Sequence, residues 1–177
     1  IMRKPVQGQE RKALTVSDGF DAETLGLCWQ WNHNPVNEAW SLTERPGYLR
    51  LKAQKATSLF DARNTLTQRM EGPTCEATVA IDLRNMKNGD RAGFSAFNSD
   101  ATLLAVRKTD GRLYLSMDEE KVKLANDTKA ITHVKQGSLT DVIRLRKPVI
   151  YLRIEGDFRP GETKDQIKCY YSLNNKK

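Results

Sequence analysis

Apolar and polar residues alternate at every second position over much of the chain, which is the pattern of β-strands with one buried face. No long stretch has helical spacing. One face buried and one face wet is typical of antiparallel sheets, so the alternation predicts an all-β chain. The expected strands include one at residues 27–31, with Leu27, Trp29 and Trp31 on one face, and others at 48–53, 74–83, 113–117, 150–154 and 167–173.

Turn-forming dipeptides separate these stretches at short intervals. Glycine and proline in such pairs supply the backbone conformations that tight reversals need. Many short strands at regular spacing predict a sandwich or barrel, here of roughly ten or more strands. We expect residues 127–140 to form a loop. The dipeptides are Pro46-Gly47, Gly72-Pro73, Asn88-Gly89, Asp110-Gly111 and Pro160-Gly161.

Length and charge then narrow the class of protein. The chain has 177 residues, of which 38% are hydrophobic and 29% charged, and this suits one globular domain. A net charge of +7 raises the question of nucleic-acid binding, but the basic residues alternate with acids, as in residues 118–123. A nucleic-acid reader usually gathers its basic residues on one element, so we expect no nucleic-acid partner. No run approaches the ~18 apolar residues of a membrane span, and we expect no membrane partner.

The chain shows no complete catalytic apparatus. Acid/base hydrolysis of a glycosidic bond needs two carboxyl groups held across it, and the context singles out no such pair. The run Asp118-Glu119-Glu120 is typical of a solvated hairpin end. His33 and His133 stand apart, and neither a Gly-x-Ser-x-Gly elbow nor a Gly-rich phosphate loop occurs. Three cysteines cannot all pair within the chain. We therefore expect no catalytic residue and no cofactor.

The densest chemical information lies in a Trp-rich segment and the polar stretch after it. If exposed, the rings of Trp29 and Trp31 would stack on sugar rings, with neighbouring amides as hydrogen-bonding partners. If buried, they would fill the interior of the sandwich. Burial is favoured because Leu27 shares their phase. The polar stretch supplies the candidates for contact with a sugar or a neighbouring domain, namely Asn32, His33 and Asn34.

A second polar stretch spans residues 58–69. The alternation places Arg63, Thr65, Thr67 and Arg69 on one face of an expected strand, and Phe60 and Asp61 precede it. Such a face would bind a glycan, dock against a neighbouring domain or simply meet solvent.

The two stretches belong to a longer ordered set of motifs, which resembles the C-terminal domain behind the catalytic propeller of many family 43 glycoside hydrolases. That family contains β-xylosidases and α-L-arabinofuranosidases. The motifs are Leu25-Gly26-Leu27-Cys28-Trp29-Gln30-Trp31-Asn32-His33-Asn34-Pro35, Trp40-Ser41-Leu42, Arg45-Pro46-Gly47-Tyr48-Leu49-Arg50-Leu51, Ala62-Arg63-Asn64-Thr65-Leu66-Thr67-Gln68-Arg69 and Gly89-Asp90-Arg91-Ala92-Gly93, with Tyr151-Leu152-Arg153 and Tyr170-Tyr171-Ser172-Leu173 further on.

This resemblance implies a concanavalin A-like jelly-roll β-sandwich. It also implies an accessory role beside an N-terminal five-bladed propeller in the same polypeptide, which would carry the catalytic carboxylates and act on xylan- or arabinoxylan-type polysaccharides. Residues 1–12 would be the connector from that domain, and residues 13–177 the β-sandwich. Polysaccharide substrates imply a periplasmic or extracellular location. The alternative is an independent carbohydrate-binding, lectin-like module.

In related β-xylosidases a loop of the sandwich helps to close the substrate pocket, often with an aromatic residue. By position, this resemblance assigns that place to Phe60, with Asp61 and Arg63 as neighbours and an oligosaccharide substrate as the ligand. Sugar-handling sandwiches often hold a structural calcium, for which Asp18, Asp21 and Asp157 are candidate ligands. Because domains of this family usually continue past Tyr-Ser-Leu, we also expect the sandwich to lack its last strands here.

Overall fold

The computed structural model describes residues 16–161 and 165–175. The expected connector at residues 1–12 lies outside the described residues. Within the described part no helix is long and apolar enough to cross a membrane. The elements are β1 (Gln30–Trp31), a short 3-10 helix η1 (Asn37–Ala39), β2 (Trp40–Ser41), β3 (Arg50–Leu51), β4 (Leu66–Thr67), β5 (Thr74–Asp82), β6 (Arg91–Phe97), β7 (Asp100–Thr109), β8 (Arg112–Leu124), β9 (Ile131–Ser138), β10 (Ile143–Leu145), β11 (Val149–Asp157) and β12 (Gln166–Ser172).

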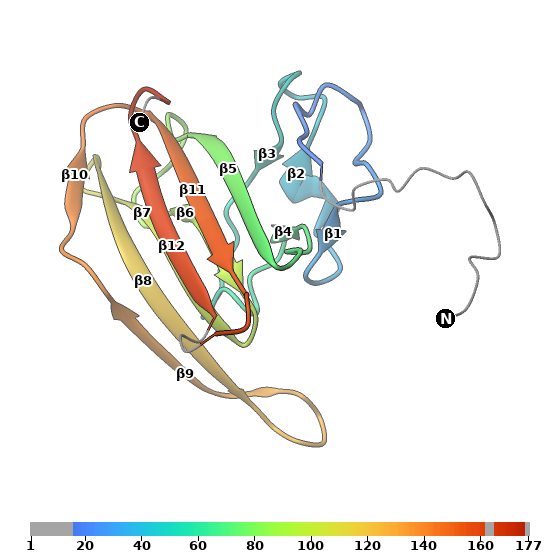
Figure 1. Ribbon diagram of the computed structural model, residues 1–177. Coiled ribbons are helices and arrows are strands. Elements are labelled where there is room, and N and C mark those ends of the chain that lie inside the picture. The colour runs from blue at the N-terminus through green and yellow to red at the C-terminus, as the bar shows by residue number, and fades with distance from the viewer. Residues whose placement is uncertain (1–15, 162–164, 176–177) are drawn as a thin grey trace.

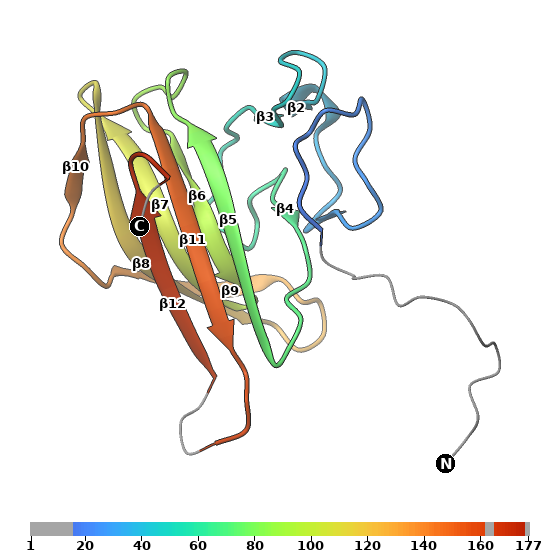
Figure 2. The ribbon, with the colours of Figure 1, turned by 45° about the horizontal axis from the view of Figure 1, so that its top comes forward.

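Two antiparallel sheets lie face to face, as Figures 1 and 2 show. In the larger sheet β6, β7 and β8 are neighbours, and β9 and β10 pair with successive parts of the far edge of β8. The smaller sheet has the order β5, β11, β12. All strand pairings among the described residues are antiparallel. The prediction of an all-β antiparallel sandwich is confirmed.

The main core lies between the two sheets, where the inward positions of β7, β8 and β11 meet. Along β11 every second residue is buried, as the alternation at residues 150–154 predicts. On the inward face of residues 113–117 in β8, Leu115 is buried, and Leu113 and Met117 are partly buried and pack against the same core. The prediction is wrong at the end of β12, where Tyr171 and Leu173 are exposed, because β12 is an edge strand with a neighbour on one side only. The buried members are Leu83, Leu104, Val106, Leu115, Leu145, Ile150, Leu152 and Ile154.

The larger sheet is also covered on its second face, and this positions the candidate site. Ala101, Leu103 and Ala105 of β7 are buried there, with Leu59 and Phe97 packed against them. Leu59 comes from the irregular N-terminal part of the chain, so a loop rather than a sheet covers this face.

The N-terminal part, residues 16–72, lies beside β5 and departs most from the sequence prediction (Figures 1 and 2). Of the strand expected at residues 27–31 only β1 forms, because a turn joins the amide of Trp29 to the carbonyl of Gly26 at 3.1 Å. Leu27 is fully exposed. Of the strand expected at 63–69 only β4 forms, paired with β1.

The alternation at residues 48–53 is also misleading. Tyr48 and Leu51 are exposed, whereas Arg50 is half-buried and lies 3.5 Å from a carboxylate oxygen of Glu44. The cause is that β3 pairs only with the two-residue β2, outside the large sheets, so its apolar side chains face no core.

One turn and one expected loop complete the comparison. The hairpin between β7 and β8 turns at Asp110 and Gly111, both with positive φ (48° and 72°), as that dipeptide predicts. The segment 127–140 is not a loop throughout. Residues 131–138 form β9, whose partner is the second half of β8.

Candidate functional site

A tight turn at residues 57–61 carries Phe60, and the Asp61 side chain holds it together. Asp61 Oδ1 accepts hydrogen bonds from the amide and the hydroxyl of Ser58, both at 2.7 Å. Its Oδ2 accepts from the amide and the hydroxyl of Thr57 at 3.3 and 2.8 Å. Partial burial raises the pKa of Asp61, but these hydrogen bonds outweigh it, so the pKa lies below its ordinary value. Asp61 therefore shapes the turn as a carboxylate.

The residues after the Trp-rich segment hold the same turn from a second side. The carbonyl oxygen of Phe60 accepts hydrogen bonds from Asn32 Nδ2 at 2.9 Å and from His33 Nε2 at 2.5 Å. Because a carbonyl only accepts, Nε2 of His33 carries the hydrogen. The ring of Phe60 lies edge-on to His33, with 6.0 Å between ring centroids, and 6.3 Å from the ring of Phe97. Phe60 is half-buried.

Arg63 and Asn34 complete this connection. Arg63 donates from a terminal guanidinium nitrogen to the backbone carbonyl of Asn34 at 2.8 Å. The structure thus brings together two groups of candidates that the sequence offered separately, Asn32, His33 and Asn34 with Phe60, Asp61 and Arg63. Their contact with a sugar or another domain stays a prediction, but their contact with one another is a fact of the fold.

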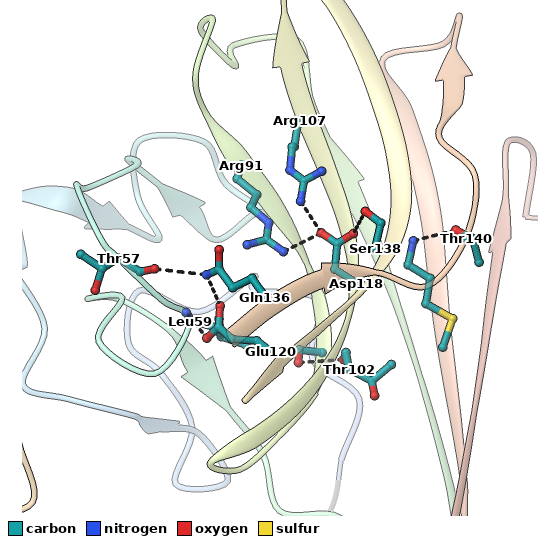
Figure 3. A network of polar contacts seen from close by, with 12 residues as sticks. Thr57, Leu59, Arg91, Thr102, Arg107, Asp118, Glu120, Gln136, Ser138 and Thr140 are labelled. Carbon is teal, nitrogen blue, oxygen red and sulfur yellow. Dashed lines mark hydrogen bonds and ion pairs between the residues drawn. The ribbon is translucent and has the colours of Figure 1, made fainter. Parts of the chain in front are cut away.

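A buried carboxylate holds the turn from below. Glu120, on β8, is 1% exposed. Its Oε1 accepts from the amide of Leu59 at 2.6 Å, and its Oε2 accepts from Gln136 Nε2 at 2.7 Å. The same Gln136 nitrogen lies 3.1 Å from the carbonyl oxygen of Thr57 and donates to it (Figure 3). The larger sheet therefore contacts the turn through its backbone at Thr57 and Leu59.

A second buried carboxylate lies two residues away on the same face of β8. Asp118 is 2% exposed, and its Oδ2 accepts from Arg91 at 2.7 Å and from Arg107 at 2.5 Å. Its Oδ1 accepts from the hydroxyl of Ser138 at 2.9 Å. Figure 3 shows this cluster beside the Glu120 contacts. Asp118 thus ties β6, β7 and β9 to β8.

The interpretation of Asp118-Glu119-Glu120 as a solvated hairpin end is wrong. β8 continues to Leu124, with β9 paired along its edge and the Leu59 loop packed on the second face of the sheet, so Asp118 and Glu120 on that face are buried. The available signal was the alternation itself, because Ser116, Asp118, Glu120 and Val122 share one phase. Both carboxylates are occupied by protein donors, and the geometry gives them a structural role.

The two tryptophans contact other aromatic rings. Trp29 stacks on Phe20 at 5.5 Å between centroids, and Trp31 lies 5.2 Å from Trp40. All three tryptophans are half-buried. Their rings pack within the N-terminal part of the chain, not between the large sheets.

The three aspartates considered as calcium ligands do not form one site. Asp18 accepts from Trp29 Nε1 and from the amide of Phe20, each at 2.7 Å. Asp157 pairs with Arg159, whose hydrogen bonds lower the pKa of Asp157 to about 2. Across residues 16–161 and 165–175, no three His, Cys, Asp or Glu side chains gather as metal ligands would, Asp21 included. The three cysteines are free.

Nearly the whole chain is similar to known proteins. The profile of the family described as "Beta xylosidase C-terminal Concanavalin A-like domain" matches residues 17–177. A β-xylosidase of Formosa agariphila is 38% identical over 126 residues, which are 59% of this chain and 21% of that protein.

Two solved structures of family 43 proteins also resemble this chain in fold. A bifunctional GH43-CE protein of Bacteroides eggerthii superposes with a TM-score of 0.77 at 36% identity, over 90% of this chain and 20% of that one. A GH43 glycoside hydrolase engineered to show both endo-xylanase and exo-arabinofuranosidase activity gives a TM-score of 0.81 at 30% identity, over 96% of this chain and 34% of that one. The matched part of this chain thus spans about a fifth to a third of these three proteins.

Proposed function

Because this chain belongs to the family of β-xylosidase C-terminal concanavalin A-like domains, we propose that it is the accessory domain of a family 43 glycoside hydrolase. In this proposal it stabilises the catalytic domain of the same polypeptide and presents Phe60 at the edge of the substrate pocket. The chain performs no hydrolysis by itself.

The observation that carries the proposal is the number of contacts that fix one short turn. Asn32 and His33 hold the carbonyl of Phe60, Glu120 holds the amide of Leu59, and Asp61 closes the turn. A group that must meet a substrate within a fraction of an ångström needs such rigid support. The half-buried ring of Phe60 offers an apolar edge against which a sugar ring can pack.

The family match supports a proposal for the partner and the substrate. The partner would be an N-terminal five-bladed propeller, with residues 1–12 as the connector. The substrate would be an oligosaccharide of the xylan or arabinoxylan type, and the enzyme would work in the periplasm or outside the cell.

The test compares variants of the full-length parent enzyme. Phe60→Ala should lower kcat/KM on xylo-oligosaccharides by about tenfold, the effect of losing one aromatic contact in the transition state. Phe60→Leu keeps most of the apolar volume, so its kcat/KM should lie between that of the parent enzyme and that of Phe60→Ala. Tyr171→Ala removes an exposed aromatic side chain from β12 and serves as the control. An unchanged kcat/KM in Phe60→Ala, with the fold intact by circular dichroism, would refute the role of the turn.

A further inference from the structure

A hollow of about 310 Å³ lies where β8 begins and β10 leads into β11. Its lining combines the apolar residues Leu113 and Leu145 with four cationic side chains. β10 lies on the side of the sandwich away from residues 16–72 (Figures 1 and 2). The hollow adjoins the start of β8, whereas the Phe60 turn rests on Glu120 near its end. The four cations are Arg112, Arg144, Arg146 and Lys147.

These cations differ from most of the other arginines in the described part of the chain, because they have no acidic partner. Arg45, Arg91 and Arg107 each bind an aspartate at 2.5–2.7 Å. Arg50, Arg84, Arg153 and Arg159 also have carboxylate partners. No hydrogen bond or ion pair joins the four cationic side chains of the hollow to another described residue. Asp110, beside Gly111, and Asp141, before β10, are the nearest acids in sequence, and neither forms an ion pair with them.

The walls of the hollow are fixed by the backbone. Leu145 pairs with Leu113 and Arg144 with Tyr114 in the ladder between β10 and β8. The carbonyl of Pro148 accepts from the amide of Leu83 at 2.7 Å, and Asn88 Oδ1 accepts from the amide of Gly111 at 2.9 Å. Four exposed cationic residues thus line one hollow on a fixed backbone frame, and their summed positive field attracts an anion.

The size and chemistry of the hollow define that anion. Guanidinium groups bind carboxylates and phosphates through paired hydrogen bonds. A volume near the lower limit for ligand pockets suits one small charged group and its ring. An extended polyanion would need a row of cations along a face, and these four surround one hollow. The lining contains no aromatic residue, so a neutral sugar has no ring to stack on.

The geometry points to a binding site for the carboxylate of a uronic acid residue on a xylan-type oligosaccharide. The polysaccharide class rests on the proposed function, whereas the anion site rests on the cations themselves. Arg144 and Arg146 hold the carboxylate, and Arg112 and Lys147 add to the positive field. The domain then retains acidic chains near the enzyme at a place separate from the Phe60 turn.

The experiment titrates the 177-residue chain, by calorimetry, with xylotetraose and with xylotetraose carrying one glucuronic acid branch. The acidic sugar should bind, the neutral one should not, and affinity should fall as salt is added. Arg144→Gln with Arg146→Gln should weaken binding by about tenfold or more, since each charge-assisted hydrogen bond is substantial. Lys123→Gln with Lys135→Gln removes two exposed charges outside the hollow and should leave binding unchanged.

Three results would overturn the inference. They are no binding of the acidic sugar, equal binding of both sugars, and binding that the double variant does not weaken. Inorganic phosphate is a third titrant, and displacement of the sugar by phosphate at equal concentration would overturn the assignment to a uronic acid. None of these outcomes touches the role of Phe60, because that is measured by turnover of the parent enzyme.

Discussion

The carboxylate of Glu120 accepts a hydrogen bond from the backbone amide of Leu59, 61 residues earlier in the chain, at 2.6 Å. This bond joins the most regular part of the fold, β8, to its least regular part, the turn that carries Phe60. A backbone amide has no alternative partner once it is buried, so the position of Leu59 depends on the acid beneath it.

Removing this acid should destabilise the chain. Glu120→Ala leaves the amide of Leu59 without an acceptor and Gln136 Nε2 with the carbonyl of Thr57 as its one remaining acceptor, which should cost about 1–3 kcal/mol for one unsatisfied donor. Glu120→Gln keeps one acceptor oxygen for Leu59 but presents an NH₂ group to Gln136. It should therefore reduce the free energy of unfolding by less than Glu120→Ala does. Urea unfolding measures both. Amide hydrogen exchange at Leu59 should speed up in the alanine variant.

The neighbouring Glu119 supplies the control. Its side chain is partly exposed and lies 3.8 Å from Lys121. Glu119→Gln should leave the free energy of unfolding nearly unchanged. Equal effects of Glu119→Gln and Glu120→Ala would show that the contact with Leu59 contributes nothing.

Asp118 should contribute to stability for a different reason, because its negative charge neutralises two arginines. Asp118→Asn leaves Arg91 and Arg107 without a counter-charge. Breaking such a buried pair is costly, but both guanidiniums are partly exposed, so we expect about 1–3 kcal/mol. Thermal unfolding measures the loss, with Lys121→Gln as a surface control. A variant as stable as the parent would show that solvent already satisfies both arginines.

Gly93 should tolerate no side chain. It lies in β6 opposite Ala105, and an added Cβ would come within 2.2 Å of the carbonyl oxygen of Leu104. That atom belongs to the backbone of β7, so the sheet itself must shift. Gly93→Ala should therefore cost about 1–3 kcal/mol or more by overpacking. Gly161, with no atom near its added Cβ, is the matched control, and Gly161→Ala should be close to neutral.

The sequence predicts the large sheets well because their strands have a core on at least one side. Ile150, Leu152 and Ile154 alternate with polar residues, and they are buried as expected. Leu27 and Leu51 show the same alternation and are exposed, because the local ribbon or turn that holds them lies outside the sandwich. Alternation reports a strand with two unlike faces, but it does not reveal whether a second layer exists.

The site shows a similar limit. The sequence offered Asn32 and His33 in one segment and Phe60 in another, but only the fold shows that the two side chains meet the carbonyl of Phe60. Glu120 escaped prediction since an acid in a charged run looks solvated. Its burial depends on Leu59 covering the second face of the sheet, and no local pattern shows that contact.

The pKa shifts predict how stability changes with acidity. The pKa of Asp157 is lowered to about 2, chiefly by hydrogen bonds from Arg159. The pKa values of Asp61 and Asp82 are also lowered: burial raises each of them, but hydrogen bonds from Ser58 and Thr57 to Asp61, and from Arg45 to Asp82, outweigh that effect. A carboxyl with a lowered folded pKa stabilises the fold above its unfolded pKa, and the gain is lost as the pH falls through the folded one. Stability should therefore decline as the pH falls from about 4 to about 2.

Asp61→Asn isolates one part of this decline. The amide keeps an oxygen for Ser58, but its nitrogen cannot accept from Thr57, so the variant should be less stable than the parent at neutral pH. At low pH the parent's Asp61 is protonated and loses the same advantage, so the two unfolding curves should approach each other. Urea midpoints measured across this pH range test it. Asp141→Asn, at an exposed position before β10, should instead follow the parent at every pH. A gap between Asp61→Asn and the parent that stays constant from neutral pH to pH 2 would show that the charge of Asp61 plays no part in holding the turn.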